Sequence, residues 1–457
     1  MRSAGPAQSH RAGPDRGSPG HRGPGPPPRA PRRPSRPHPR QSRRGSDLRK
    51  SRRPGPGDPL PARCASSSSH ATLHMRCQIG ALVPSAMSRR LHPAGRRRTV
   101  APARSETEPM PASSYAHLPL AQRLILEEVD RRAHARFGDL MGVTLRQEPD
   151  PHRLPRVAWP LCLNDKFIWR KIFDRNPDFK AVANKLAVRD WAAAEGIDVT
   201  FPRVLWRGRD PEKLPPRLLK GWVMVKTNHG WQSNIAIRGG RPGRAAVLQK
   251  AREALAQDHG RRSHEWSYLG MPRRVFVEEW IGAGRPLDEL KMHTYGARIG
   301  RVSHTRDRFG AHSQRRYEAD AAGVLRPSAH PPDRGRRLHD GPLPAAWPEA
   351  VRIARSIGSR FDHMRVDLLI DADRVYLGEL TVYHLAGAYR DIGWYDDHPV
   401  ARMWDLRQSW FLTTPQRGWR AVYARVLRQV LDAEARRHPP PGAASGIPDL
   451  AHGPWPA

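Results

Sequence analysis

The sequence predicts an α+β protein whose folded part begins near residue 115. Segments with the apolar spacing of helices alternate with short runs rich in β-branched and aromatic residues, and no internal repeat is apparent. All 32 aromatic residues lie from Tyr115 onward, whereas 15 of the 47 prolines fall within the first 61 positions. The segment before Tyr115 therefore has little apolar area to bury, and burying it cannot offset the entropy of ordering that segment. We expect residues 1–114 to form a disordered basic leader.

The formal net charge of +35 is divided almost equally between the leader and the remainder. Residues 1–110 carry 23 basic and 5 acidic residues, and residues 111–457 carry 56 and 39. A basic arm of this kind could bind nucleic acid without sequence preference. The composition is also that of a GC-rich reading frame upstream of a later start at Met75, Met87 or Met110, and we favour a leader without function. The excess of positive charge on residues 111–457 suits an enzyme that binds phosphate groups.

The cysteines and the apolar runs exclude several classes of protein. Cys64, Cys77 and Cys162 show neither a pairing pattern nor the Cys/His spacing of a zinc module. No run approaches the roughly 20 consecutive apolar residues of a transmembrane helix. The short run before Met87 contains Pro84 and makes a poor signal-peptide core. We expect a cytoplasmic protein without a transmembrane segment.

The first expected elements are helices. An N-terminal helix and linker are expected over residues 115–160, because apolar residues recur at helical spacing from Leu120 to Phe137. A second helix is expected over residues 178–197, where Ala and Lys are abundant and Gly196 supplies a stop.

Strands follow, separated by polar loops and one helix. The expected strands are rich in β-forming residues and lie at 201–208, 221–227, 235–240 and 273–281. The expected helix has Ala-rich helical periodicity at 245–257.

The last part of the chain is expected to contain two strands within residues 291–305, a Pro-rich loop at 327–344, a helix at 347–361 and a hairpin at 364–380. The chain is then expected to end in a helix at 413–435 and a disordered tail at 436–457.

The hairpin brings two carboxylates together. With a three-residue turn, Asp371 pairs with Val375 and, counting back, Asp367 pairs with Glu379. Side chains paired in this way lie about 5 Å apart at Cβ and face the same side of the sheet. Like charges so placed repel, and a bridging divalent cation relieves the repulsion with the oxygen ligands that Mg²⁺ prefers. The alternative is a pair of solvated edge carboxylates in a slipped register.

Lysines and glutamates also lie at the ends of expected elements. Lys185 lies on the Ala-rich helix, and Lys226 ends an apolar strand just before the polar run 228–234. Such a turn can direct N–H groups and a lysine at phosphate oxygens, although the Walker A pattern is absent. Glu278 and Glu279 end another apolar run. At such a strand end, backbone groups could bind an adenine, and a carboxylate could bind a ribose. For each lysine alone, a solvated surface charge is the alternative.

Together these features resemble the ATP-grasp superfamily and, more narrowly, the TupA-like ATP-grasp family associated with bacterial cell-surface polysaccharide synthesis. The resemblance runs from about Cys162 to Trp410. Its carriers are NDKFIWRKIFDRNPDFKAVANKLAVRDW, VKTNHGWQSNI, VFVEEWI, ELKMHTYGARIGRV, TRDRF and MRVDLLIDADRVYLGELTVY. The last is also similar to the metal-binding end of D-alanine:D-alanine ligases. The resemblance implies an ATP-grasp fold over residues 161–412, with the nucleotide held between two α+β subdomains.

The resemblance also implies ATP and Mg²⁺ as cofactors and a role for each matching residue. The residues that it assigns to the nucleotide are Lys185, Lys226, Asn228, His229, Gly230, Ser233, Glu278, Glu279 and Trp280. It assigns Asp367 and Glu379 to the metal, together with Thr381, which stands where many ATP-grasp enzymes have Asn. It assigns Arg308, Arg365 and Lys291 to the transferring phosphoryl group or the acyl-phosphate.

The implied reaction is ATP-dependent activation of a substrate carboxylate as an acyl-phosphate, followed by attack of an amine. The substrate would be a small molecule or a polysaccharide precursor in a teichuronopeptide-like pathway. The alternatives are a polysaccharide glycosyltransferase, which would need a nucleotide-sugar site, and a non-catalytic ATP-binding scaffold. No convincing D-x-D motif with a Rossmann-like glycine turn supports the first of these. Specific nucleic-acid binding is not expected, because no known binding module is present. The sequence does not predict the oligomeric state. The histidines His229, His293, His304 and His384 are expected to form hydrogen bonds rather than to act as a general base.

Overall fold

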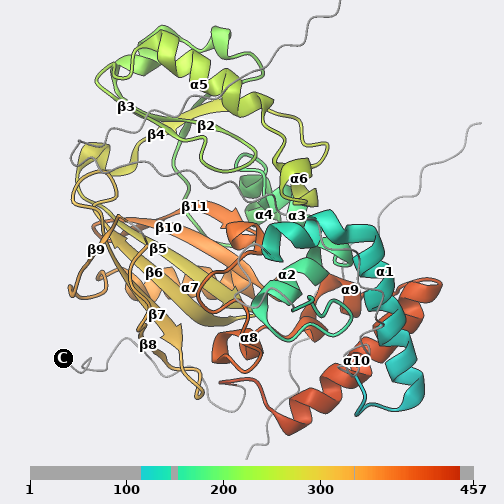
Figure 1. Ribbon diagram of the computed structural model, residues 1–457. Coiled ribbons are helices and arrows are strands. Elements are labelled where there is room, and N and C mark those ends of the chain that lie inside the picture. Colours follow the sequence, from blue (N-terminus) through green and yellow to red (C-terminus); the bar gives the residue numbers. More distant parts are fainter. Residues whose placement is uncertain (1–114, 146–152, 334, 443–457) are drawn as a thin grey trace, which may run out of the picture. The chain divides into compact units, whose positions relative to one another are not determined.

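The computed structural model describes residues 115–145, 153–333 and 335–442 (Figure 1). The expected leader and residues 443–457 of the expected tail lie outside these ranges. Helices and two mostly antiparallel sheets make up the described part, which confirms the expected α+β class. No helix within the described ranges is long and apolar enough to cross a membrane.

The helices lie before, between and after the strands. Their bounds are α1 (Leu120–Leu145), α2 (Leu163–Ile172), α3 (Asp178–Val182), α4 (Val188–Ala194), α5 (Arg244–Ala256), α6 (His259–Arg262), α7 (Trp347–Gly358), α8 (Pro399–Met403), α9 (Trp410–Thr413) and α10 (Trp419–Arg437). The observed C-terminal helix thus begins six residues later than expected and ends within the expected tail.

The smaller sheet has four antiparallel strands in the order β1-β4-β2-β3. They are β1 (Val204–Gly208), β2 (Trp222–Thr227), β3 (Ile235–Arg238) and β4 (Val275–Glu279). Val223, Val225 and Ile237 pack with Val247 and Leu248 of α5 in a core of their own. This sheet and α5 therefore form one α+β subdomain.

The larger sheet has the order β11-β10-β5-β6-β7-β8, with β9 beside β7. Its strands are β5 (Asp288–Tyr295), β6 (Arg298–Arg306), β7 (Ser313–Ala319), β8 (Leu325–Pro327), β9 (Arg337–Leu338), β10 (Met364–Asp371) and β11 (Arg374–Thr381). Strand β7 was not expected, because SQRRYEA has no apolar run to mark it.

Helix α7 packs against one face of the larger sheet, beside β5, β6 and β10. Its buried apolar residues recur at helical spacing and include Trp347, Ala350, Ile353, Ala354 and Ile357. The sheet meets this helix with a transverse row of apolar residues, one from each of four neighbouring strands. This row is Val366, Met292, Val302 and Tyr317.

The next row across the same four strands faces the opposite side, because side chains alternate along a strand. This polar row is Asp367, Lys291, Ser303 and Arg316. One face of the sheet is thus apolar and covered by α7, and the other is charged.

The helix expected over residues 178–197 is wrong as a single helix. The segment forms α3 and α4, and Lys185 lies in the turn between them. The Asn184 side chain accepts hydrogen bonds from the backbone N–H of Leu186 and Ala187, at 3.0 and 3.3 Å. An Asn that caps its own downstream N–H groups in this way competes with a continuous helix.

The hairpin has a different turn from the one expected. Asp371 pairs with Arg374 rather than with Val375, so the turn has two residues. A bulge then shifts the register between Asp367 and the next residue, and Asp367 still pairs with Glu379. The expected carboxylate pair is confirmed, although the expected turn is wrong.

Candidate functional site

The charged face of the larger sheet forms one wall of a cavity of about 890 Å³. Strands β5, β6, β7, β10 and β11 contribute side chains to this wall. The segments 231–234 and 262–268 also line the cavity. Seven of the predicted site residues line it: Lys226, Lys291, Arg308, Arg365, Asp367, Glu379 and Thr381.

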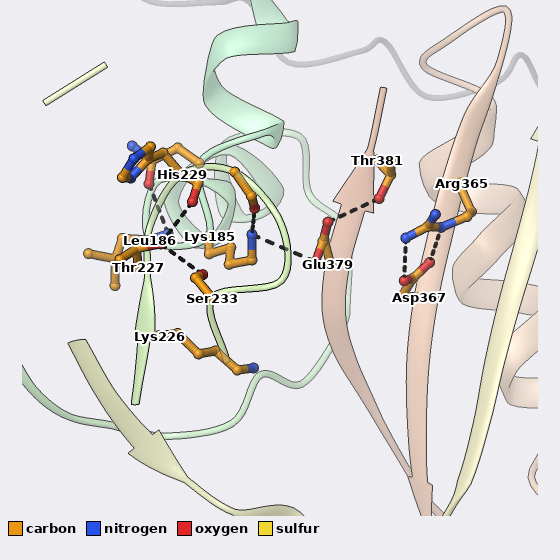
Figure 2. Close-up of polar contacts among 12 residues, drawn as sticks. Lys185, Leu186, Lys226, Thr227, His229, Ser233, Arg365, Asp367, Glu379 and Thr381 are labelled. Carbon is orange, nitrogen blue, oxygen red and sulfur yellow. Dashed lines mark hydrogen bonds and ion pairs between the residues drawn. The ribbon is translucent and has the colours of Figure 1, made fainter. Parts of the chain in front are cut away.

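The two predicted metal ligands lie opposite each other at one end of the polar row. The Asp367 carboxylate accepts hydrogen bonds from Nε and Nη2 of Arg365 at 2.6 and 2.7 Å, and Lys291 Nζ lies 3.7 Å from its Oδ2. Glu379 Oε1 accepts a hydrogen bond from Thr381 Oγ1 at 3.1 Å. Figure 2 shows Arg365 and Asp367 on β10, and Glu379 and Thr381 on the adjacent strand β11.

Glu379 also meets the phosphate-binding lysine expected from the sequence. Lys185 Nζ lies 3.7 Å from Glu379 Oε2 (Figure 2). Burial raises the pKa of Glu379, but Lys185, Arg365 and Lys291 outweigh it and hold this pKa below its ordinary value. Glu379 is therefore ionised at neutral pH. Two ionised or hydrogen-bonded carboxylates on neighbouring strands are a donor set suited to Mg²⁺.

Lys185 also holds the loop 228–234. Its Nζ donates to the carbonyl of Gly230 at 2.6 Å, and its backbone N–H donates to the carbonyl of Asn228 at 2.9 Å. Thr227 Oγ1 braces the loop further, within hydrogen-bond distance of the His229 carbonyl and of Ser233 Oγ. The loop is thus tied to the lysine that contacts the metal end of the cavity.

The loop requires a glycine at position 230. Gly230 has φ +70°, and a Cβ there would lie 2.1 Å from Cδ2 of His259. Trp231 packs against the same His259 ring, with 5.0 Å between the ring centroids. The residues of this loop that line the cavity are Trp231, Gln232 and Asn234, rather than the predicted Asn228, His229, Gly230 and Ser233.

Lys226, predicted at the phosphates, and Glu278 and Glu279, predicted at the adenine, all contact other groups of the protein. Lys226 forms an ion pair with Glu278, and Arg189 Nη2 lies 3.7 Å from the other oxygen of that carboxylate. The backbone N–H of Glu279 donates to the Arg203 carbonyl at 3.0 Å, because β4 is an inner strand of the small sheet. That N–H is therefore not free for an adenine.

Trp280 is buried between aromatic neighbours. Its ring centroid lies 5.3 Å from that of Trp222 and 4.7 Å from that of Phe309, and the Arg238 guanidinium lies over its ring. Neither Glu278, Glu279 nor Trp280 lines the cavity. The predicted approach of Glu278 and of the Glu279 and Trp280 backbone to an adenine stays a prediction.

The residues predicted at the transferring group converge on one end of the cavity. Arg365 and Lys291 both contact Asp367. Arg308 Nη1 donates to Glu289 Oε1 at 2.7 Å, and Lys291 Nζ lies 3.7 Å from the same oxygen. Arg308 thus contacts Glu289 and not Asp367, whereas Arg365 and Lys291 contact Asp367 directly.

The histidines have hydrogen-bond partners, as expected. His229 Nε2 lies 3.4 Å from the Gln257 carbonyl, and burial lowers the pKa of His229 to about 4. His293 Nδ1 lies 3.0 Å from Tyr389 Oη, and His384 Nδ1 accepts from Arg365 at 2.6 Å. His304 Nε2 lies 2.7 Å from an Asp288 oxygen.

Several cavity residues were not predicted from the sequence. Arg301 and Arg316 lie at the far end of the charged face, on β6 and β7. Glu265 enters from the segment after α6. Arg301 and Ser303 stand on either side of Val302, and this short alternation could have indicated the polar face of β6. Nothing local indicates Glu265.

The comparisons with known proteins identify the family. The family model for TupA-like ATP-grasp proteins matches residues 165–397, just over half of the chain. A search of curated proteins found no match. The matched region contains the loop 228–234, strand β4 and the hairpin that carries Asp367 and Glu379.

Solved structures show weak similarity. D-Alanine-D-alanine ligase from Helicobacter pylori aligns at 11% identity over 46% of this chain and 56% of its own, with a TM-score of 0.26. An N5-carboxyaminoimidazole synthase from Aspergillus clavatus aligns at 15% over 57% and 54%, with a TM-score of 0.28. The alignments thus span little more than half of those two chains. On the family match, the chain belongs to the TupA-like ATP-grasp family.

Proposed function

We propose that this protein is an ATP- and magnesium-dependent carboxylate–amine ligase that activates its substrate as an acyl-phosphate. The observation that carries the proposal is the facing pair of Asp367 and Glu379 in a cavity wall, surrounded by Lys185, Lys291 and Arg365. Carboxylates for a hard cation, next to cations for phosphate oxygens, are the groups that phosphoryl transfer needs. Family membership supports the same chemistry.

Asp367 and Glu379 would hold Mg²⁺ through carboxylate oxygens. A bound Mg²⁺ neutralises phosphate charge and makes the γ-phosphorus more electrophilic. Thr381 is not a third metal ligand in this proposal. Its hydroxyl donates a hydrogen bond to Glu379 and so orients that carboxylate. Lys185 would meet the phosphates from the loop side.

The chemical steps need little side-chain chemistry. A substrate carboxylate oxygen attacks the γ-phosphorus of ATP, and ADP leaves. The amine loses one proton to water if it is bound as an ammonium group. Its nitrogen then attacks the acyl carbon, inorganic phosphate leaves, and the nitrogen loses its remaining extra proton. Arg365, Lys291 and Arg308 stabilise the negative charge of the transferring group, a task suited to guanidinium and ammonium groups that are already oriented.

The far end of the cavity supports an acidic carboxylate substrate. Arg316 lies three strands from Asp367 in the polar row, a separation of about 14 Å at the usual strand spacing. Arg301 lies beside it. Asp391 contacts both guanidinium groups, Glu318 also pairs with Arg301, and Asp333 also pairs with Arg316. A substrate with its reacting carboxylate at Asp367 can reach these arginines with a second acidic group. A uronic-acid polysaccharide precursor in the cytoplasm, where ATP is supplied, fits this description.

The experiment that tests this function uses the full-length chain. It is incubated with Mg·ATP, hydroxylamine and a panel of uronic and amino acids, and both ADP and hydroxamate are measured. ADP release together with hydroxamate, dependent on one class of carboxylate, is expected. Mg·ATP binding without either product from any carboxylate would instead favour a non-catalytic scaffold. The engagement of both Asp367 oxygens by Arg365 is the observation in favour of that second candidate.

A further inference from the structure

Glu265 is a buried carboxylate with one free oxygen in the cavity wall. The residue is 2% exposed, and its Oε2 has no hydrogen-bond partner among the described residues. Its segment is anchored beneath it, because Lys171 Nζ donates to the Ser263 and Ala386 carbonyls, both at 2.7 Å. A buried carboxylate oxygen without a partner costs free energy unless a ligand satisfies it.

Glu265 also lacks a cation at contact distance. Among the described residues, no Lys, Arg or His nitrogen lies within 4.0 Å of its carboxylate. Lys171, whose charge acts on Glu265, directs two of its three N–H groups at carbonyl oxygens and forms no ion pair with the Glu265 carboxylate. The described side chains therefore leave room for a cationic ligand at Glu265.

The surroundings of Glu265 suit an ammonium group. Trp231, Tyr268 and Tyr383 line the same cavity, and the Trp231 side chain hydrogen-bonds to Glu265. Tyr383 Oη is buried without a partner in the described part of the chain, and it interacts electrostatically with Glu265. Aromatic rings attract cations through their faces, and a phenol oxygen can accept an N–H. A carboxylate and a phenol in the same cavity wall are thus both acceptors available to an ammonium group.

Glu265 lines the same cavity as the metal pair. Burial raises the pKa of Glu265, the charge of Lys171 lowers it, and the negative charge of Glu379 raises it. The pKa of Tyr268 is raised by its burial and then by the charges of both Glu265 and Glu379. A group held at Glu265 would therefore share the cavity in which the acyl-phosphate forms.

We propose that Glu265, with Tyr383, binds the primary ammonium group of the amine co-substrate. This inference rests on the proposed ligase function. A second metal ion fits less well, because only one carboxylate oxygen is free and the surrounding wall is aromatic, whereas Mg²⁺ requires several oxygen ligands. The amine donor is then a compound with a free primary ammonium group, such as an amino acid.

The turnover test compares Glu265→Gln with wild type, and Glu253→Gln on an exposed part of α5 serves as the control. Hydroxylamine is largely uncharged at neutral pH and bypasses an ammonium site, whereas glycine and ethylamine require one. For Glu265→Gln we expect hydroxamate formation within twofold of wild type and a KM for glycine or ethylamine at least tenfold higher. Equal losses with hydroxylamine and with amines, or a higher Mg²⁺ requirement, would overturn the proposal.

A binding test needs no turnover. Isothermal titration of ethylamine into the full-length chain with Mg·ADP is expected to show binding to wild type. Weaker binding is expected for Tyr383→Phe, and none for Glu265→Gln. If wild type binds ethylamine through Glu265 but forms no hydroxamate, the ligase function fails while the ammonium site stands. Equal ethylamine affinity in wild type and Glu265→Gln would refute the ammonium site alone.

Discussion

Asp367 and Glu379 lie directly opposite each other because a bulge in the hairpin compensates for a short turn. From the two-residue turn, regular pairing would place Gly378 opposite Asp367 and direct Glu379 to the apolar face. The bulge shifts the register by one residue, and Glu379 joins Asp367 in the cavity wall. The metal pair thus depends on one irregularity of the sheet.

Replacing either member of this pair should abolish turnover. Asp367→Asn and Glu379→Gln are each expected to lower kcat by about 100-fold or more, because even the outer partners of a metal site contribute 10- to 100-fold. Asp371→Asn is the matched control, since Asp371 is on the same strand but pairs with Arg285 outside the cavity wall. ADP release measured against Mg²⁺ concentration checks this. Normal turnover in both site variants would show that the metal assignment is wrong.

Lys185 should contribute to nucleotide binding. Lys185→Met removes the hydrogen bond to Gly230 and the charge next to Glu379, and a hydrogen bond to a charged group is worth about 1.5 to 3 kcal/mol. We expect Mg·ATP to bind at least about tenfold more weakly by isothermal titration. Lys180→Met, at an exposed position of α3, should leave affinity unchanged. An unaltered Kd in Lys185→Met would exclude this role.

Gly230 should be more sensitive to substitution than another glycine with positive φ. Gly239→Ala, with φ +55° and nothing within 4 Å of the added Cβ, should cost only the left-handed strain of about 1 to 2 kcal/mol. Gly230→Ala adds a clash with the His259 ring and should lower the Tm and the ATP affinity more. Adding His259→Ala should restore part of the loss. Equal Tm values for the two single variants would show that the ring yields without cost.

Stability should depend on pH through Glu265. Burial raises the pKa of Glu265 from 4.5 to about 7, so the folded protein holds this proton more tightly than the unfolded chain. The contribution of Glu265 to stability is therefore full below about pH 4.5 and is lost as the pH rises through 7. Glu265→Gln should raise the Tm at pH 8 relative to wild type, with the difference shrinking toward pH 5. A Tm difference independent of pH would contradict this.

Arg316 should affect the acidic substrate and not the nucleotide. Arg316→Gln is expected to raise the KM of a uronic-acid substrate about tenfold while the KM of ATP changes little, in line with 1.5 to 3 kcal/mol for a charged hydrogen bond. Arg326→Gln, on the neighbouring strand and 59% exposed, is the control. Steady-state kinetics with both substrates checks this. A parallel rise in both KM values would indicate a structural role for Arg316.

The sequence was sufficient where the chemistry is local. Runs rich in β-forming residues marked β2 and β4, and the spacing of Asp367 and Glu379 around a turn indicated the carboxylate pair. The helix break at Asn184 was missed, because a side chain that caps its own downstream N–H groups outweighs the helix propensity of Ala and Lys. The family motifs located Lys185, but only the turn between α3 and α4 leaves its backbone N–H free to donate to the Asn228 carbonyl.

Only the tertiary structure decided which charged side chains share the cavity. Lys291, Arg316 and Asp367 are far apart in the sequence, and the register of four antiparallel strands brings them into one row. Glu265 reaches the cavity because Lys171 ties its segment to the chain after β11. Such positions follow from long-range strand pairing and burial, and neither leaves a periodic signal in the local sequence.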